Sequence, residues 1–191
     1  MSARGDPHPH PAAERARRVA LLVCDVDGVL TDGRLYFGAR GELIKAFDVR
    51  DGLGLKLLRA AGIEVALLTA RRSAIVATRA RELGLARVLQ GASDKGAGLQ
   101  RLLAAAALPA QRCAYIGDDW PDLPCLHSVA RAGGLAATVA DACAEAKAAA
   151  HWIAAAPGGR GAVRQLAEFI LRAQGRFDEL LRAHGQAPAH A

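Results

Sequence analysis

Residues 19–33 read Val-Ala-Leu-Leu-Val-Cys-Asp-Val-Asp-Gly-Val-Leu-Thr-Asp-Gly, and this stretch decides the fold. It opens with a continuous apolar run of strand length, Val19–Val23, and continues into carboxylates and glycines. A run that is apolar at every position indicates a strand with both faces buried, as in a parallel sheet covered by helices. The polar residues after it would lie at the carboxyl end of that strand, where open α/β sheets bind their ligands.

The chain downstream of this stretch repeats the alternation of strand and helix. Apolar runs of strand length are separated by longer segments of helical pattern, several of which stop at a glycine. We expect strands at 64–68, 87–89, 113–116, 136–139 and 151–153, an alanine-rich helix before the last of them, and further helices at 52–61, 73–83, 94–107, 122–129 and 162–183, with a break at Gly175. This alternation predicts an α/β fold with a mostly parallel, Rossmann-like sheet and helices on both faces.

The length of 191 residues suffices for one hydrophobic core and is short for two. We expect a single domain at 19–185, preceded by a flexible leader at 1–18 and followed by a tail at 186–191. Within the domain, 33–47 depart from the alternation. Two short apolar stretches there flank Gly38-Ala39-Arg40-Gly41, which predicts a β-hairpin flap.

Composition favours a globular protein of the reducing cytoplasm. Hydrophobic residues make up 52% and charged residues 23% of the chain, and no apolar run approaches the roughly 18 residues that span a bilayer. The four cysteines show neither paired nor zinc-ligand spacing, so we expect free thiols. The net charge of +6 leaves a nucleic-acid binder as an alternative, but no aromatic-rich basic stretch accompanies it. We therefore expect a small anionic substrate, with neither nucleic acid nor membrane as a partner.

Asp25 and Asp27 are the first candidates for chemistry. Side chains alternate along a strand, so both carboxylates would face the same side. Two neighbouring carboxylates raise each other's pKa unless a cation lies between them, which suits a metal site combined with a nucleophile and an acid. A plain turn is the alternative, because Asp and Gly are common turn residues.

Three later strand ends carry further polar groups. Thr69 and Arg71 follow the strand at 64–68, although a threonine there can also be a helix N-cap. Lys95 lies at a helix start, where a cation opposes the helix dipole unless an anion is near, and a solvated surface lysine is the alternative. Asp118 and Asp119 follow a buried strand. Adjacent carboxylates of this kind bind hard cations, of which Mg²⁺ fits best.

The order Asp-x-Asp, Thr, Lys, Gly-Asp-Asp along the chain resembles the haloacid dehalogenase superfamily. The hairpin at 33–47, the segment Asp48-Val49-Arg50-Asp51-Gly52 and the late stretch 158–164 are similar to one family within it, the 3-deoxy-D-manno-octulosonate 8-phosphate (KDO-8-phosphate) phosphatases. The likeness runs from about Val19 to Gly185. It implies Mg²⁺-dependent hydrolysis of KDO-8-phosphate to the free sugar acid and phosphate, as a step of lipopolysaccharide precursor synthesis.

The resemblance also implies roles for individual residues in catalysis. Asp25 would be the nucleophile that forms an aspartyl phosphate. Asp27 would act as general acid and then as general base. Thr69 and Lys95 would stabilise the charge that develops on the phosphate oxygens.

Metal and substrate ligands follow from the same resemblance. Magnesium would be held by the side chains of Asp25 and Asp118 and by the carbonyl oxygen of Asp27. Asp119 and Asp122 would position the metal and its waters. The residues implied in substrate binding are Asp27, Asp48, Val49, Arg50, Asp51, Gly52, Lys56, Arg71, Arg79 and Lys95.

The candidate substrate site carries more cations than one phosphate needs. Arg50, Lys56, Arg71 and Arg79 would suit a sugar acid that has both a phosphate and a carboxylate, although such cations also occur on solvated helix faces. Lys56 stands where the family often has Arg, and Ala70 stands where it has Gly. Another sugar-acid phosphate, such as a nonulosonate 9-phosphate, and a phosphatase-like module without activity are alternatives that the motifs leave open.

The hairpin also predicts assembly. An isolated two-stranded hairpin is marginally stable in water, and this one is too apolar to remain exposed on a monomer. Its apolar residues are Leu35, Tyr36, Phe37, Leu43, Ile44 and Phe47. We expect hairpins of several subunits to pack together and shield the aspartyl phosphate from water. The family resemblance implies a homotetramer.

Overall fold

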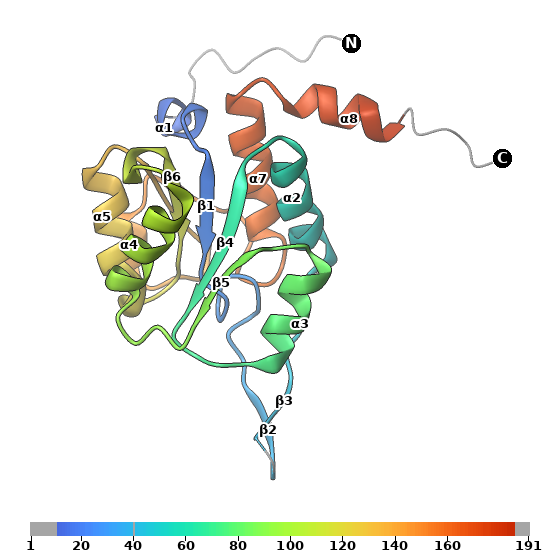
Figure 1. Cartoon of the computed structure of the whole chain (residues 1–191), viewed down its shortest axis with the longest axis vertical. Helices are drawn as coiled ribbons and strands as arrows, with labels where there is room; N and C mark the ends of the chain where they lie inside the picture. Colours follow the sequence, from blue (N-terminus) through green and yellow to red (C-terminus); the bar gives the residue numbers. More distant parts are fainter. Residues whose placement is uncertain (1–10, 40, 186–191) are drawn as a thin grey trace, which may run out of the picture.

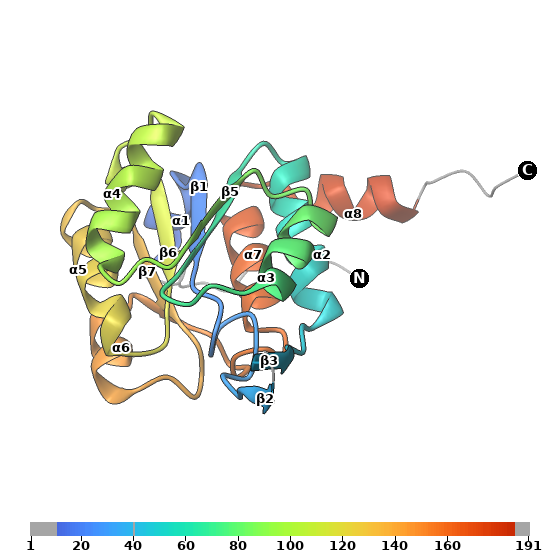
Figure 2. The ribbon, with the colours of Figure 1, turned by 60° about the horizontal axis from the view of Figure 1, so that its bottom comes forward.

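The computed structural model describes residues 11–39 and 41–185, in which a six-stranded parallel sheet lies between two layers of helices (Figures 1 and 2). The strands run in the order β5-β4-β1-β6-β7-β8, and each neighbouring pair is parallel. Their bounds are β1 (Leu21–Cys24), β4 (Glu64–Thr69), β5 (Arg87–Gln90), β6 (Cys113–Ile116), β7 (Leu135–Thr138) and β8 (Trp152–Ile153). The predicted α/β fold with a Rossmann-like sheet is confirmed.

The helices divide between the two faces of this sheet. Figure 2 shows α2 (Val49–Ala60), α3 (Ala74–Glu82) and α7 (Ala162–Ala173) on one side, and α4 (Lys95–Ala106), α5 (Leu123–Arg131) and α6 (Ala144–Ala149) on the other. Short 3₁₀ helices, η1 (Ala110–Arg112) and η2 (Trp120–Asp122), flank β6, and α8 (Phe177–Gly185) follows α7. Asp48, Ser73 and Asp94 each cap a helix by accepting a backbone N–H from its first turn, which explains where α2, α3 and α4 begin.

The position of β1 creates a crevice at the carboxyl edge of the sheet. From β1 the chain passes to β4 and β5 on one side, and then returns to β6, β7 and β8 on the other. At such a switch in direction the loops leave the sheet toward opposite faces and a binding crevice opens between them. All four residues of β1 are fully buried, so the loop that follows it starts from the middle of the core.

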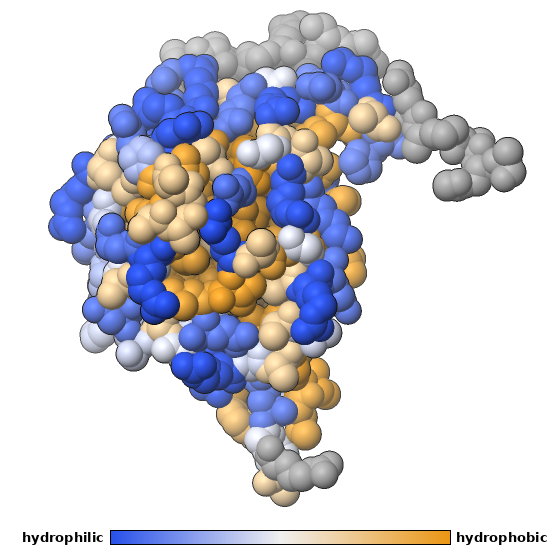
Figure 3. Space-filling view, viewed as in Figure 1, coloured by the Kyte–Doolittle hydropathy of each residue, from blue (hydrophilic) through white to orange (hydrophobic). Residues whose placement is uncertain are grey.

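The predicted hairpin is present and projects from this edge of the sheet (Figure 1). It consists of β2 (Tyr36–Gly38) and β3 (Gly41–Ile44), which pair antiparallel. Lys45, the residue after β3, buries its side chain in the protein. Phe37, Leu43 and Ile44 remain 58%, 59% and 58% exposed, and the hairpin carries apolar surface in Figure 3.

Part of the segment expected to be a flexible leader is packed on the core instead. A short helix, α1 (Ala13–Arg17), buries Ala16, and the preceding Ala12 is buried as well. Arg15 donates to the carbonyl oxygens of Ala130 at 3.2 Å and Gly134 at 2.8 Å, which fixes the helix to the loop before β7. We therefore place the start of the domain at Ala12. The rest of the leader, 1–10, and the tail, 186–191, lie outside the described residues.

None of the helices in the described part of the chain is long and apolar enough to cross a membrane.

Candidate active site

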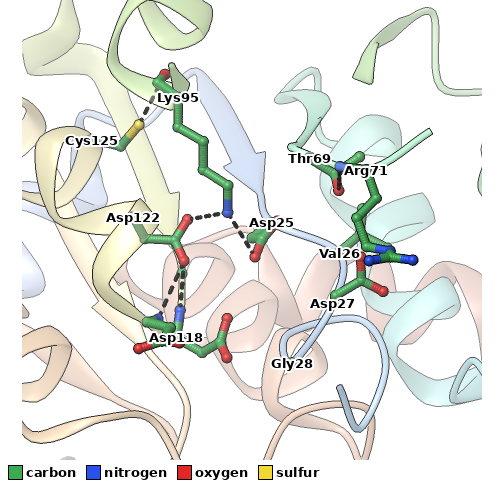
Figure 4. A network of polar contacts seen from close by, with 12 residues as sticks. Asp25, Val26, Asp27, Gly28, Thr69, Arg71, Lys95, Asp118, Asp122 and Cys125 are labelled. Atoms are coloured by element: carbon green, nitrogen blue, oxygen red, sulfur yellow. Dashed lines mark hydrogen bonds and ion pairs between the residues drawn. The ribbon is translucent and has the colours of Figure 1, made fainter. Parts of the chain in front are cut away.

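Lys95 and Asp25 form the centre of a buried polar network at the carboxyl edge of the sheet (Figure 4). Asp25 follows β1 directly, and its backbone N–H donates to the carbonyl oxygen of Ile116 at 3.0 Å, which ties the loop to β6. Lys95 is the first residue of α4, and its Nζ lies 2.9 Å from Asp25 Oδ2 and 2.7 Å from Asp122 Oδ1. The alternative of a solvated surface lysine is therefore wrong.

Asp118 and Asp122 complete this network from the loop after β6. One carboxylate oxygen from each of Asp25, Asp118 and Asp122 lies within 4.8 Å of the other two. Asp122 is fully engaged: Oδ1 accepts from the Tyr115 hydroxyl at 2.5 Å as well as from Lys95, and Oδ2 accepts from two backbone N–H groups of the loop. Asp122 therefore holds the loop in shape, while the carboxylates of Asp25 and Asp118 have oxygens left for a ligand.

Electrostatics at this network favour a bound cation. Burial raises the pKa of Asp25 to about 7, with a further contribution from the charge of Asp122, and Lys95 opposes both. Burial and then the charge of Asp25 raise the pKa of Asp118 to about 8. Burial alone would lower the pKa of Lys95, but the charges of Asp25 and Asp122 hold it above its ordinary value. The buried negative charge therefore exceeds what one lysine balances.

The residues present fit Mg²⁺. The available donors at the cluster are oxygens, which a hard divalent cation prefers. The approach is open because Gly28 lacks a side chain: a Cβ there would lie 2.1 Å from Asp118 Oδ2. Gly28 also has a φ of +88°, a conformation that favours glycine.

Asp27 lies apart from this cluster, contrary to the expectation that its carboxylate faces the same way as that of Asp25. Strand β1 ends at Cys24, so side-chain alternation does not extend to Asp27. The loop instead folds back, with the N–H groups of Leu30 and Thr31 donating to the Val26 carbonyl. In Figure 4 the side chain of Asp27 points away from the other carboxylates, and it forms an ion pair with Lys45 of the segment after β3.

A cavity of about 270 Å³ opens over these groups. It is lined by Asp25, Asp27, Gly33, Thr69, Ala70, Arg71, Lys95, Asp118, Asp119, Pro121 and Asp122. Thr69 is the last residue of β4, and its buried hydroxyl accepts the N–H of Arg71 at 3.3 Å. Ala70 has no positive φ, so the local backbone does not need the glycine usual in the family that the sequence resembles. The four residues expected in catalysis therefore share one cavity.

The residues expected to bind substrate are divided between this cavity and a separate region. Arg71 lines the cavity, with its guanidinium carbon 5.7 Å from the centre of the Phe37 ring in the hairpin. Arg79 lies outside it, over the Phe47 ring at 5.8 Å, beside an open groove of about 480 Å³ that Val49 also lines. Lys56 is exposed on α2 and lines neither.

The segment 48–52 serves mainly to organise the start of α2 and its neighbours. Asp48 caps the helix and pairs with the guanidinium of Arg50 at 2.6 Å. Asp51 is buried and accepts the backbone N–H groups of Gly161 at 3.1 Å and Arg164 at 2.7 Å. Asp51 thus caps α7, and Gly52 packs under the Arg79 guanidinium, where a Cβ would lie 2.4 Å from an arginine nitrogen. Among the described residues, none of this segment lines the cavity over Asp25 and Lys95.

The stretch 158–164 packs directly on the loop after β1, which carries Asp25 and Asp27 and is called the catalytic loop below. A Cβ at Gly158 would lie 1.8 Å from the carbonyl oxygen of Gly28, so only glycine fits there. The backbone N–H of Gly159 donates to the Val29 carbonyl at 2.9 Å. The loop that carries Asp25 and Asp27 is therefore shaped by a segment far away in the sequence.

Sequence reasoning missed two members of the site. Tyr115 was expected only as a strand residue, although its hydroxyl orients Asp122. Lys45 follows an apolar strand and belongs to no motif, so its contact with Asp27 could be found only from the folded hairpin.

Comparisons with known proteins first define the class. A hydrolase of the haloacid dehalogenase superfamily from Legionella pneumophila, of putative function, superposes with a TM-score of 0.84 at 41% identity, covering 92% of this chain and 94% of that one. No family model matches the chain. Together with the sheet and the cavity at its carboxyl edge, this places the chain among the haloacid dehalogenase-type hydrolases.

The particular family follows from two further proteins. The chain is 43% identical over 165 residues to the 3-deoxy-D-manno-octulosonate 8-phosphate phosphatase of Yersinia pestis, covering 86% of both chains. The corresponding phosphatase of Moraxella catarrhalis, crystallised with a magnesium ion, a phosphate ion and KDO, superposes with a TM-score of 0.87 at 38% identity, covering 93% of this chain and 99% of that one. The chain belongs to the KDO-8-phosphate phosphatase family.

Proposed function

We propose that this chain is a Mg²⁺-dependent phosphomonoesterase that hydrolyses KDO-8-phosphate to KDO and inorganic phosphate. The observation that carries the proposal is the cluster of Asp25, Asp118 and Asp122, with the buried Lys95 paired to Asp25, in a cavity at the switch point of the sheet. The family relatives support the substrate, and the magnesium, phosphate and KDO of the Moraxella structure support the ligand set.

Catalysis follows from the groups around the cavity. Asp25 attacks phosphorus, the bond from phosphorus to the sugar oxygen breaks, and Asp27 gives its proton to that oxygen. Water then attacks the aspartyl phosphate, Asp27 takes the water's proton, and phosphate leaves with Asp25 restored. Lys95 and Thr69 hold the phosphate oxygens as charge moves between them. The side chains of Asp25 and Asp118 and the carbonyl oxygen of Asp27 would hold Mg²⁺, which would supply further positive charge beside the phosphate oxygens.

Substrate selection is proposed to use the surplus of cations. Arg71 lines the cavity and is available to a substrate carboxylate. Arg50, Lys56 and Arg79 lie outside it in one subunit and would contribute only where a neighbouring subunit completes the site. A panel of KDO-8-phosphate, a nonulosonate 9-phosphate and glucose 6-phosphate, each with Mg²⁺ or EDTA, tests the proposal. We expect KDO-8-phosphate to have the highest kcat/KM and EDTA to abolish turnover; equal efficiency on the neutral sugar phosphate would contradict it.

Assembly as a homotetramer with a shared hairpin is the second part of the proposal. The exposed hairpin residues and the open groove beside Phe47 and Val49 are apolar surfaces that a monomer would leave in water. Light scattering should give the mass of four chains, and Phe37→Ser combined with Ile44→Ser should reduce that mass together with activity. A fully active monomer would contradict the shared cap and leave the aspartate chemistry unaffected.

The compartment is proposed to be the cytoplasm, and the cysteines support this. Cys24, Cys113, Cys125 and Cys143 are all free thiols, as expected in a reducing environment.

A further inference from the structure

We propose that Lys45 is a positioning residue for proton transfer, because its buried ammonium holds the Asp27 carboxylate in one orientation over the cavity. The inference rests on the proposed function, in which Asp27 acts as general acid and base. Lys45 belongs to no recognised motif, and its role is assigned here from its contacts alone.

Lys45 is buried to an unusual degree for a residue beside an exposed hairpin. Its side chain is 1% exposed, whereas the neighbouring Ile44 is 58% exposed. The ammonium pairs with Asp27 Oδ1 and lies 3.1 Å from Glu42 Oε1. Burying a lysine costs desolvation and rotamer freedom, so a buried lysine is retained only where its charge is paired. Here both partners are carboxylates.

These contacts extend into a chain that crosses three elements. The second oxygen of Glu42 accepts the hydroxyl of Ser73, and Ser73 Oγ in turn accepts the N–H of Val76 as the N-cap of α3. The order Asp27, Lys45, Glu42, Ser73 therefore connects the catalytic loop, the hairpin and a helix of the core. The base of the hairpin is fixed at the point where it meets the proposed acid.

The orientation of Asp27 depends on this contact. Within the residues that the structure describes, Lys45 is the only cation paired with the Asp27 carboxylate. Without it, the side chain could rotate toward the guanidinium of Arg71, which lines the same cavity. An acid delivers its proton efficiently only when it is held within hydrogen-bond reach of the leaving oxygen. Lys45 supplies that restraint.

A merely structural role for Lys45 makes a different prediction. If the lysine only fastened the hairpin, its removal would act on substrate binding, assembly or stability, and it would do so whether or not Asp27 can transfer protons. If it acts through Asp27, its effect should vanish once Asp27 is no longer an acid. A double-mutant cycle separates the two cases.

The experiment measures kcat and KM for KDO-8-phosphate in the wild type, Lys45→Met, Asp27→Asn and the double variant. We expect Lys45→Met to lower kcat by about 10- to 100-fold, less than the roughly 10²- to 10⁴-fold attributed to general acid–base catalysis as a whole, with KM changed less than about threefold. In the Asp27→Asn background the same change should cost less than about twofold. Equal losses in both backgrounds, or an unchanged kcat in the single variant, would overturn the proposal.

Three further variants keep the test decisive. Lys147→Met is the matched control: it removes a lysine of α6 that does not line the cavity, and it should leave kcat unchanged. Lys45→Gln keeps an N–H donor, although one bond closer to the backbone, and should retain more kcat than Lys45→Met. It also replaces the Met variant in the cycle if that variant does not fold. Glu42→Leu breaks the link to Ser73 but not the pair with Asp27. A loss of kcat as large as that of Lys45→Met would show that the attachment of the hairpin to Ser73, and not the pair with Asp27, sets kcat, and would overturn the proposal.

Failure of the proposed function would look different from failure of this inference. A wild type that releases no phosphate from KDO-8-phosphate would refute the proposed substrate, and the cycle would then be run on the panel member with the highest kcat/KM. A wild type that is active on KDO-8-phosphate but shows additive losses in the cycle would refute the role of Lys45 alone.

Discussion

At Lys95, a full positive charge is buried between two carboxylates, with its ammonium within 3 Å of both. Removing one partner from such a group leaves the remaining charges uncompensated, which typically costs about 3–5 kcal/mol. We therefore expect Lys95→Met to lower the free energy of unfolding by several kcal/mol, and Lys147→Met, the matched change at a half-buried lysine with no such partners, to have little effect. Urea titration in EDTA measures both.

The loss at Lys95 should also depend on pH. In the metal-free protein the pKa of Asp25 is about 7, above its ordinary 3.8, so the folded state holds a proton that the unfolded state releases. The stability that this group contributes is present at low pH and is lost as pH rises from 3.8 to about 7. Lys95 opposes the shift, so the Met variant should be destabilised more at about pH 8 than at about pH 5. A larger loss at low pH would contradict this account.

The proposed role of Asp25 as nucleophile can be tested with an isosteric substitution. Asp25→Asn keeps the volume of the side chain but removes the nucleophilic oxygen charge, so turnover should fall by more than about 10⁴-fold. The circular dichroism spectrum should stay that of the wild type, and Asp178→Asn, at an exposed position of α8, should be fully active. Turnover within roughly tenfold of the wild type would refute Asp25 as the nucleophile.

The residues of the candidate site that lie beside a strand end or a helix start were predictable from the sequence. Asp25, Thr69, Lys95 and Asp118 each follow or end a strand or begin a helix, and the parallel sheet brings such positions to one edge. The orientation of Asp27 was not predictable in this way, because it depends on where β1 stops and on a lysine from the hairpin. A contact between two distant loop residues, such as Lys45 and Asp27, is not indicated by any hydrophobic pattern in a single sequence.

At the scale of elements, α7 depends on a carboxylate from another helix. Its N-cap residue, Gly161, has no side chain, and Asp51 of α2 accepts two backbone N–H groups there instead. We expect Asp51→Ala to lower the free energy of unfolding by about 1–3 kcal/mol, because buried N–H groups lose their acceptor. Asp178→Ala, at an exposed carboxylate in the first turn of α8, is the control. A change confined to KM, with stability intact, would instead indicate that Asp51 contacts substrate.

The predicted boundaries of helices and strands agree with the structure where a capping residue or a glycine marks the end of the element. The strand at Cys113–Ile116 has the predicted bounds, and the helix predicted at 94–107 is α4, with Asp94 as its N-cap. The helix predicted from 52 begins at Val49 instead, because its N-cap is Asp48 and its first turn contains the charged residues Arg50 and Asp51, which do not extend the apolar pattern. The packed helix α1 was missed, since a helix of five residues is too short to show a hydrophobic period, and the burial of Ala16 against the core is not visible in the sequence.

For the whole molecule, the buried carboxylates predict that metal binding and stability are linked. A ligand that binds only the folded protein stabilises it by about 2.7 kcal/mol at a hundredfold excess over its Kd. Mg²⁺ should therefore raise the melting temperature and EDTA should reverse the rise, while Ca²⁺, which needs more ligands at longer distance, should do less. Asp118→Asn should reduce the shift; a shift of the same size in that variant would place the metal elsewhere.

The contact of Gly158 and Gly159 with the catalytic loop also constrains when the enzyme can first work as it is made. Asp25 leaves the ribosome early, but β1 needs β4 and β6 beside it, and the loop after β1 needs a segment that is translated more than 130 residues after Asp25. Domains generally fold as units during synthesis. The nascent chain therefore carries the proposed nucleophile, Asp25, through most of translation without a formed site, and we expect hydrolysis to begin only after residues 158–159 have been added.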